Sequence, residues 1–92
     1  MDIRQVNNEK NGHFEAFDSE SVAGRMFYVW AGDHKFIIDH TEVNEAFAGQ
    51  GVGKKLVMKA VEYARDNNLK IIPLCPFAKS VFDKVEEIQD VL

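Results

Sequence analysis

The sequence has one cysteine, two prolines and no long apolar run, and each shortage excludes a class of protein. Cys75 alone cannot form an internal disulfide, and the three histidines are too scattered for a Cys/His metal site. The first residues carry no apolar stretch, so we expect no signal peptide. No segment reaches the roughly 20 apolar residues of a membrane span. These shortages predict a cytoplasmic protein with no metal and no membrane partner.

Positive charge is also scarce, because 11 Lys and Arg stand against 15 Asp and Glu, for a net charge of −4. Binding to a phosphate backbone needs clustered basic residues, so this balance argues against nucleic acid as a partner. Apolar residues are plentiful at 46%, with seven Phe, two Tyr and one Trp. A chain of 92 residues with this supply predicts one domain spanning 1–92, either a monomer or a weak homodimer.

Hydrophobic spacing changes halfway along the chain. The first half alternates and contains turn signals, which predicts an antiparallel meander of four strands over 2–7, 13–17, 24–31 and 35–43. From Gly51 the apolar spacing becomes helical and continues to a stop signal at Asn67-Asn68. A short apolar strand over 70–75 follows, so strand, helix and strand imply a parallel crossover.

The two prolines indicate how the last strand and the last helix are placed. Pro73 predicts that the strand over 70–75 lies at a sheet edge, where one missing backbone donor is tolerated. Pro76 suits the first turn of a second helix, whose apolar spacing continues to Ile88. Cys75 would then be the N-cap of that helix. The predicted fold class is therefore α+β, with a mixed sheet: a four-stranded meander, then a helix, a parallel strand and a C-terminal helix.

The segment from Ala48 to Lys54, AGQGVGK, joins a strand to a helix. Glycines let backbone amides approach a ligand closely, and the first amides of a helix favour an anion, so this segment predicts a phosphate site. It is not a P-loop, because Ala48 replaces the first glycine of that motif and Lys55 its Ser or Thr. It is not a Rossmann loop either, because Lys54 takes the place of the third glycine. A tight turn that binds nothing is the alternative.

Three blocks in this order resemble the GNAT superfamily of N-acetyltransferases, and within it the minimal YjdJ-type subgroup. The blocks are His40-Thr41-Glu42-Val43, the stretch from Gly49 to Val57, and Ile72 to Phe77. The superfamily motif, [RQ]-x-x-G-x-[GA], falls on residues 48–53. Gly51 and Gly53 match it, whereas Ala48 replaces the leading Arg or Gln. The resemblance implies a truncated GNAT-like fold, without the usual helices between the first two strands and without the last pair of strands.

The same resemblance implies transfer of an acetyl group from acetyl-CoA to an amine that the sequence does not identify. The loop would hold the CoA pyrophosphate, the backbone at Val43 would pair with the pantetheine or the acetyl carbonyl, and the second helix would complete the site. The implied CoA-binding residues are Val43, Gly49, Gln50, Gly51, Val52, Gly53, Lys54, Phe77 and Ser80. A CoA-binding module without efficient transfer is the main alternative, and a scaffold domain that binds nothing is a third.

Candidate catalytic residues follow from position. Acyl transfer needs a base for the incoming ammonium and an acid for the CoA thiolate. Alternation over 35–43 places His40 and Glu42 on one face with Phe36 and Ile38, and either could act as the base. The alternative is that His40 and Glu42 are ordinary solvent-facing residues with no catalytic role.

An acid is harder to find, because Phe77 and Phe82 occupy the region where many relatives of this superfamily carry a tyrosine. Cys75 is a further candidate, since a helix N-terminus lowers a thiol pKa. It could accept the acetyl group, relay a proton, form a mixed disulfide with CoA, or only pack.

Overall fold

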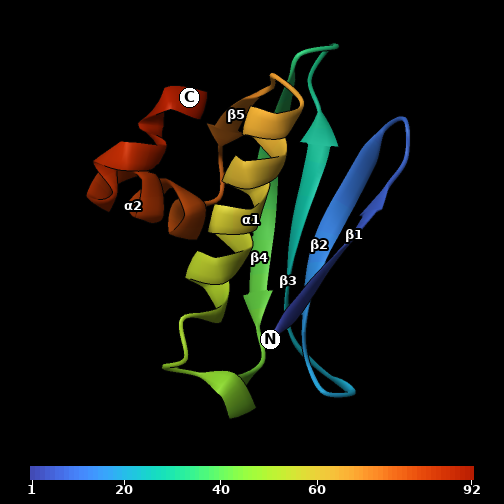
Figure 1. The fold of residues 1–92 in the computed structure, drawn as a ribbon, viewed down its shortest axis with the longest axis vertical. Helices are drawn as coiled ribbons and strands as arrows, with labels where there is room; N and C mark the ends of the chain where they lie inside the picture. Colours follow the sequence, from blue (N-terminus) through green and yellow to red (C-terminus); the bar gives the residue numbers. More distant parts are fainter.

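The computed structural model describes residues 1–92 as one mixed sheet carrying two α-helices (Figure 1). The sheet order is β1-β2-β3-β4-β5, in which the first four strands are antiparallel and β5 is parallel to β4. The elements are β1 (Asp2–Asn7), β2 (Asn11–Asp18), β3 (Ser21–Trp30), β4 (Lys35–Val43), the 3-10 helix η1 (Glu45–Phe47), α1 (Val52–Asp66), β5 (Lys70–Pro73), α2 (Pro76–Lys84) and the 3-10 helix η2 (Glu86–Val91). The predicted meander, crossover and edge position of Pro73 are confirmed.

One hydrophobic core fills the space between the sheet and the helices. Alternate residues of β2 and β3, such as Phe14 and Tyr28, point into it, because successive side chains of a strand face opposite sides. Tyr28 and Phe36 pack with ring centroids 4.9 Å apart. The apolar stripe of α1 closes the core from the other side, with Leu56 and Val57 fully buried. No polar or charged residue is buried.

The second helix is shorter than its apolar spacing predicts. It begins at Pro76 with Cys75 as N-cap, as expected, but ends at Lys84 because Val85 takes an extended conformation. Ile88 remains buried, because η2 returns the chain to the core. The Arg65 side chain holds η2 in place through an ion pair of 2.7 Å with Asp90. The prediction of one helix through Ile88 is therefore wrong, although the apolar positions were correctly identified.

A β-bulge interrupts β4 at Asp39. Phe27 pairs with His40 across β3 and β4, yet the next residue, Tyr28, pairs with Ile38. The extra residue shifts the alternation by one, so that residues after the bulge exchange faces. Phe36 and Ile38 face the core, whereas His40 and Glu42 lie on the opposite face. The prediction that these four side chains share one face is therefore wrong.

The two faces of the sheet are consequently very different. Both α-helices pack on the inner face, against the core and against each other (Figure 1). The outer face of β2, β3 and β4 carries half-buried or exposed side chains, among them His13, Arg25 and Phe27. Neither α-helix combines the length and apolar character that a bilayer crossing requires.

Candidate functional site

The glycine loop between η1 and α1 presents backbone donors. Gly49 and Gly51 have φ of +82° and +72°, in the left-handed region that favours glycine. Gly51 is the N-cap of α1 and has no side chain to cap the helix. The first intrahelical bond runs from the Lys55 amide to the Gly51 carbonyl, and none of the amides from Gly51 to Lys54 has a partner in the chain. These free amides, together with the helix dipole, form a site suited to an anion.

The third glycine, Gly53, contributes to packing and not to the shape of the loop. A Cβ on Gly53 would lie 2.5 Å from two ring atoms of Phe77, so glycine allows the Phe77 ring of α2 to lie directly on the start of α1. By contrast, a Cβ on Gly49 or Gly51 would meet no atom within 4 Å. The three glycines therefore serve two purposes: two shape the loop, and one admits an aromatic ring.

A hollow of about 500 Å³ lies between the glycine loop and α2; we call it the loop hollow. Its lining residues are Val43, Phe47, Ala48, Gly49, Gly51, Val52, Gly53, Lys54, Phe77, Ser80, Val81, Lys84 and Val85. Eight of the nine predicted CoA-binding residues are among them, and the exception, Gln50, lies outside the lining. The Ser80 hydroxyl donates to the Phe77 carbonyl at 2.7 Å, within its own helix. The hollow is thus mostly apolar, with free amides and two lysines at its rim.

The strands β4 and β5 separate beside this hollow. Their pairing ends at Ile38 and Pro73, although β4 continues to Val43. The Ile38 carbonyl accepts hydrogen bonds from the amides of Leu74, at 3.1 Å, and Cys75, at 2.9 Å. Asp39 to Val43 therefore have no partner in β5, and a gap opens between the end of β4 and the start of α2. The two strands therefore splay apart beside the loop hollow.

Cys75 lies at the point where the two strands separate. Its Sγ is 3.5 Å from Thr41 Oγ1, and its residue is 7% exposed. Burial acts to raise the pKa of the Cys75 thiol, but the Thr41 hydroxyl and the free amides of Phe77 and Ala78 stabilise the thiolate, and the pKa falls below its ordinary value. These amides do not form a regular side-chain cap to Sγ, so they act as nearby dipoles at the helix start.

Cys75 does not line the loop hollow. Thr41, its partner, was missed as a site residue, since only the bulge turns it toward Cys75. Four residues that complete the lining of the loop hollow were also missed, because the sequence does not specify how their elements pack. These residues are Phe47, Val81, Lys84 and Val85.

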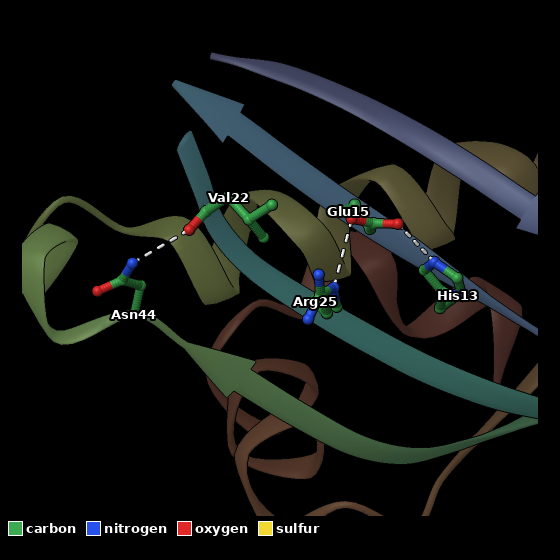
Figure 2. Close-up of polar contacts among 5 residues, drawn as sticks. All are labelled: His13, Glu15, Val22, Arg25 and Asn44. Atoms are coloured by element: carbon green, nitrogen blue, oxygen red, sulfur yellow. Dashed lines mark hydrogen bonds and ion pairs between the residues drawn. The ribbon is translucent and has the colours of Figure 1, made fainter. Parts of the chain in front are cut away.

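The other two predicted catalytic residues lie on the outer face. His40 Nε2 and Glu42 Oε1 are 3.0 Å apart, and the His40 ring stacks on Phe27 at 6.0 Å. A similar pair lies across the sheet, where His13 Nε2 is 2.7 Å from Glu15 Oε1 (Figure 2). His40 and Glu42 are therefore separated from the loop hollow by the sheet itself, and they border a second hollow on the outer face.

Two further polar contacts join β3 to β2 and to the end of β4. Arg25 Nε donates to Glu15 at 3.3 Å, which links β3 to β2 on the outer face (Figure 2). Asn44 donates to the Val22 carbonyl at 3.2 Å and caps η1, so it anchors the exit of β4 to β3 (Figure 2). No group of three or more His, Cys, Asp or Glu side chains is arranged to hold a metal ion.

A glycine loop at a helix start, reached from an antiparallel meander and followed by a parallel strand that diverges from β4, matches the truncated GNAT-like fold that the resemblance implies. The family model described as GCN5-related N-acetyl-transferase matches residues 13–91. The chain therefore belongs to the GCN5-related N-acetyltransferase family. The narrower subgroup stays a prediction. No curated protein gives a significant match.

Solved structures agree with this assignment. A GCN5-like protein from Staphylococcus aureus, described as an N-acetyltransferase by similarity, is 41% identical with a TM-score of 0.75, and the match covers 98% of this chain and 85% of that one. A ribosomal-protein-alanine N-acetyltransferase from Brucella melitensis is 14% identical with a TM-score of 0.72, over 85% of this chain and 62% of the other. An aminoglycoside N-acetyltransferase in complex with CoA is 14% identical with a TM-score of 0.67, over 90% and 88%. The last two support the fold alone.

Proposed function

We propose that this protein transfers the acetyl group of acetyl-CoA to the nitrogen of an amine. The observation that carries the proposal is the loop hollow, which extends from four free amides at the start of α1 to Val43 at the end of β4 and Phe77 at the start of α2. An anion bound at one end and a thioester placed at the other match the two ends of acetyl-CoA. Membership of the family supports the same reaction.

Binding would begin at the glycine loop. The pyrophosphate accepts hydrogen bonds from the amides of Gly51, Val52 and Gly53, with Lys54 adding positive charge. The pantetheine then follows the unpaired edge of β4 at Val43, across the apolar lining beside Phe77. This path brings the thioester toward Thr41 and Cys75.

The chemistry divides between the two faces of β4. The Cys75 thiolate attacks the thioester carbonyl, the C–S bond to CoA breaks, and CoA leaves as a thiolate. The amine nitrogen then attacks the acetyl-Cys75 carbonyl. The new C–N bond forms, and the bond between the acetyl carbon and Cys75 Sγ breaks. The proton that the amine loses passes through water to the His40–Glu42 pair, because these side chains lie on the outer face and do not contact Cys75 directly.

The first experiment tests CoA binding by isothermal titration. Gly51→Ala forces a left-handed conformation on alanine in the loop, and we expect CoA affinity to fall by about tenfold or more. Gly32→Ala is the matched control, because Gly32 has φ of +84° and equal space but lies in the β3–β4 turn. Equal affinities of the two variants would refute the loop assignment.

The second experiment tests turnover. The protein is incubated with acetyl-CoA and a panel of primary amines, and both the products and the intact protein are analysed by mass spectrometry. We expect an acetylated amine and, in the absence of amine, one acetyl group on Cys75. Bound CoA without product would favour the CoA-binding module, which the lack of a tyrosine in α2 supports. Unchanged turnover of Cys75→Ala would show that the amine attacks acetyl-CoA directly.

A further inference from the structure

The two edges of the sheet differ in how they are protected against a further strand. β5 has only four residues, and it begins at Lys70 and ends at Pro73. Both residues discourage strand pairing, because lysine brings a charge to the edge and proline has no backbone donor. β1 has six residues, contains neither lysine nor proline, and pairs with β2 without a register shift. The edge of β1 is therefore the unprotected one.

The backbone of β1 retains groups that can pair. Alternate residues of an edge strand direct their N–H and C=O groups away from the sheet. Beyond the pairing with β2, no backbone group of residues 2–7 makes a hydrogen bond in the chain. No other element lies beside this edge (Figure 1). A further antiparallel strand therefore fits against β1.

A row of alternating charges crosses the outer face of the sheet and ends at β1. In the order of strand pairing, its members are Arg4, Glu15, Arg25 and Glu42. Residues that lie opposite each other in neighbouring strands share a face, so each charge stands beside an opposite one. Arg4 has Glu15 on the β2 side and no strand on its open side. A strand that continues the alternation must therefore bring a carboxylate opposite Arg4.

A second copy of β1 supplies this carboxylate. In an antiparallel pair centred on Ile3, Asp2 of each copy lies opposite Arg4 of the other. Both side chains are exposed and lie on the outer face, so they are available to a partner. A pair centred on Arg4 would instead bring the two arginines together, and like charges in opposite positions repel. A pair centred on Gln5 would place Val6 opposite Arg4. Charge therefore selects the register centred on Ile3.

The inner face of the same edge is partly apolar. A hollow of about 470 Å³, which we call the edge hollow, lies between the start of β1 and α1. Met1, Ile3 and Met58 line it, and Met1 and Met58 are 47% and 38% exposed. In the pair centred on Ile3, the two Ile3 side chains meet beside this hollow and cover apolar surface. Lys54 and Lys55 also line it, and their repulsion between copies weakens the association.

We propose that this protein forms a homodimer through the edges of β1, with Ile3 at the two-fold axis and two Asp2–Arg4 ion pairs across it. The two sheets then join into one. No residue of β1 lines the loop hollow, so both loop hollows stay open in the dimer. Two short strands bury less surface than a stable dimer needs, so we expect a dissociation constant in the micromolar to millimolar range. The inference does not depend on the proposed acetyl transfer.

The test is sedimentation equilibrium of the full chain from about 10 μM to about 1 mM, because dimer formation depends on concentration. We expect a monomer–dimer equilibrium. Asp2→Lys and Arg4→Glu each replace two attractive pairs by two repulsive ones, so each should raise the dimer Kd by about tenfold or more. Asp33→Lys is the matched control. It makes the same charge change in the β3–β4 turn, away from β1, and should leave the Kd unchanged.

Mixing the two β1 variants separates dimer contacts from damage within one chain. Arg4→Glu also faces Glu15 of its own chain, so it could loosen β1 whether or not a dimer exists. In a mixed dimer of Asp2→Lys with Arg4→Glu, both cross-strand pairs again join opposite charges, so association should return.

Four results would overturn the proposed dimer. They are a monomer at every concentration, an unchanged Kd for Asp2→Lys, an equal loss of association in Asp33→Lys, and no association when the two β1 variants are mixed. None of these measurements involves CoA, so a failure of the proposed acetyl transfer would leave the dimer standing.

Discussion

The two faces of this sheet carry opposite chemistry. The inner face is closed by α1 and α2, buries only apolar residues, and ends in a hollow whose polar groups are backbone amides. The outer face is open and carries histidines, carboxylates and arginines. Apolar packing on one face therefore stabilises the fold and shapes the CoA site. The other face is left free for charged groups, whose burial would be costly.

A single strand serves both faces. In β4, Thr41 points toward Cys75 while its neighbours His40 and Glu42 point to the outer face. The bulge at Asp39 sets this division, because it shifts the alternation after Ile38. We therefore expect inner-face changes to act on stability and on CoA binding, and outer-face changes to act on local charge.

The largest expected effect is loss of inner-face packing. Phe36 is fully buried and its ring packs against Tyr28, Trp30 and Tyr63. Phe36→Ala should lower the free energy of unfolding by about 3–5 kcal/mol, because it leaves a cavity in the core. Urea denaturation followed by circular dichroism measures the change.

The matched change on the outer face is Phe27→Ala. Phe27 is half-buried and contacts the rings of His13 and His40, so its loss leaves no closed cavity. We expect a cost below about 1.5 kcal/mol. Equal destabilisation by the two substitutions would break the claim that only the inner face carries the core.

A smaller effect is expected where α2 meets the glycine loop. Gly53→Ala places a Cβ 2.5 Å from the Phe77 ring, which must move to relieve the contact. We expect a loss of about 1–3 kcal/mol in stability and weaker CoA binding, because Phe77 lines the loop hollow. Thermal unfolding and isothermal titration give the two values.

The control for that prediction is the double variant Gly53→Ala with Phe77→Ala. Removing the ring also removes the clash, so the two changes should be strongly non-additive. Additive losses would show that the Gly53 backbone, and not its contact with Phe77, determines the effect.

The next effect concerns only the reactivity of Cys75. Thr41→Val removes the hydroxyl 3.5 Å from Sγ, so the pKa of Cys75 should rise and less thiolate should be present at neutral pH. Alkylation by iodoacetamide should slow by up to about tenfold, the effect of one pKa unit. The rate is followed by mass spectrometry. Ser80→Ala is the control, because that hydroxyl bonds within its own helix; a similar slowing there would contradict the assignment to Thr41.

Much of the fold could be predicted from local patterns. Alternation, helical spacing and proline positions located every strand and α-helix, because each depends on residues close in sequence. Val85 shows the limit, since its extended conformation ends α2 where the apolar spacing continues to Ile88. The chain then continues into η2, which is held by Arg65 from α1, a contact that no local pattern predicts.

The site was less predictable, for one physical reason. The bulge at Asp39 has no sequence signal, yet it decides which face each later residue of β4 occupies. Alternation alone therefore grouped His40 with Phe36 and missed Thr41. The glycine loop was located because the left-handed φ of Gly49 and Gly51 is a local backbone demand that favours glycine, whereas the contact of Gly53 with Phe77 depends on tertiary packing.

The smallest expected effect concerns the Glu15 carboxylate on the outer face. The Glu15 carboxylate accepts a hydrogen bond from His13 at 2.7 Å and another from Arg25, and these contacts outweigh partial burial and hold its pKa below the ordinary 4.5. A carboxylate with a lowered pKa stabilises the fold above that ordinary value, and this contribution disappears as the pH falls through the pKa of the folded state. Glu15→Gln should cost about 0.5 kcal/mol at neutral pH and nothing in strong acid. Urea denaturation over this pH range measures it, with Glu20→Gln, which removes an unpaired carboxylate, as control. A loss that persists in acid would mean that Glu15 stabilises the sheet by packing and not by charge, and the outer face would then resemble the inner one.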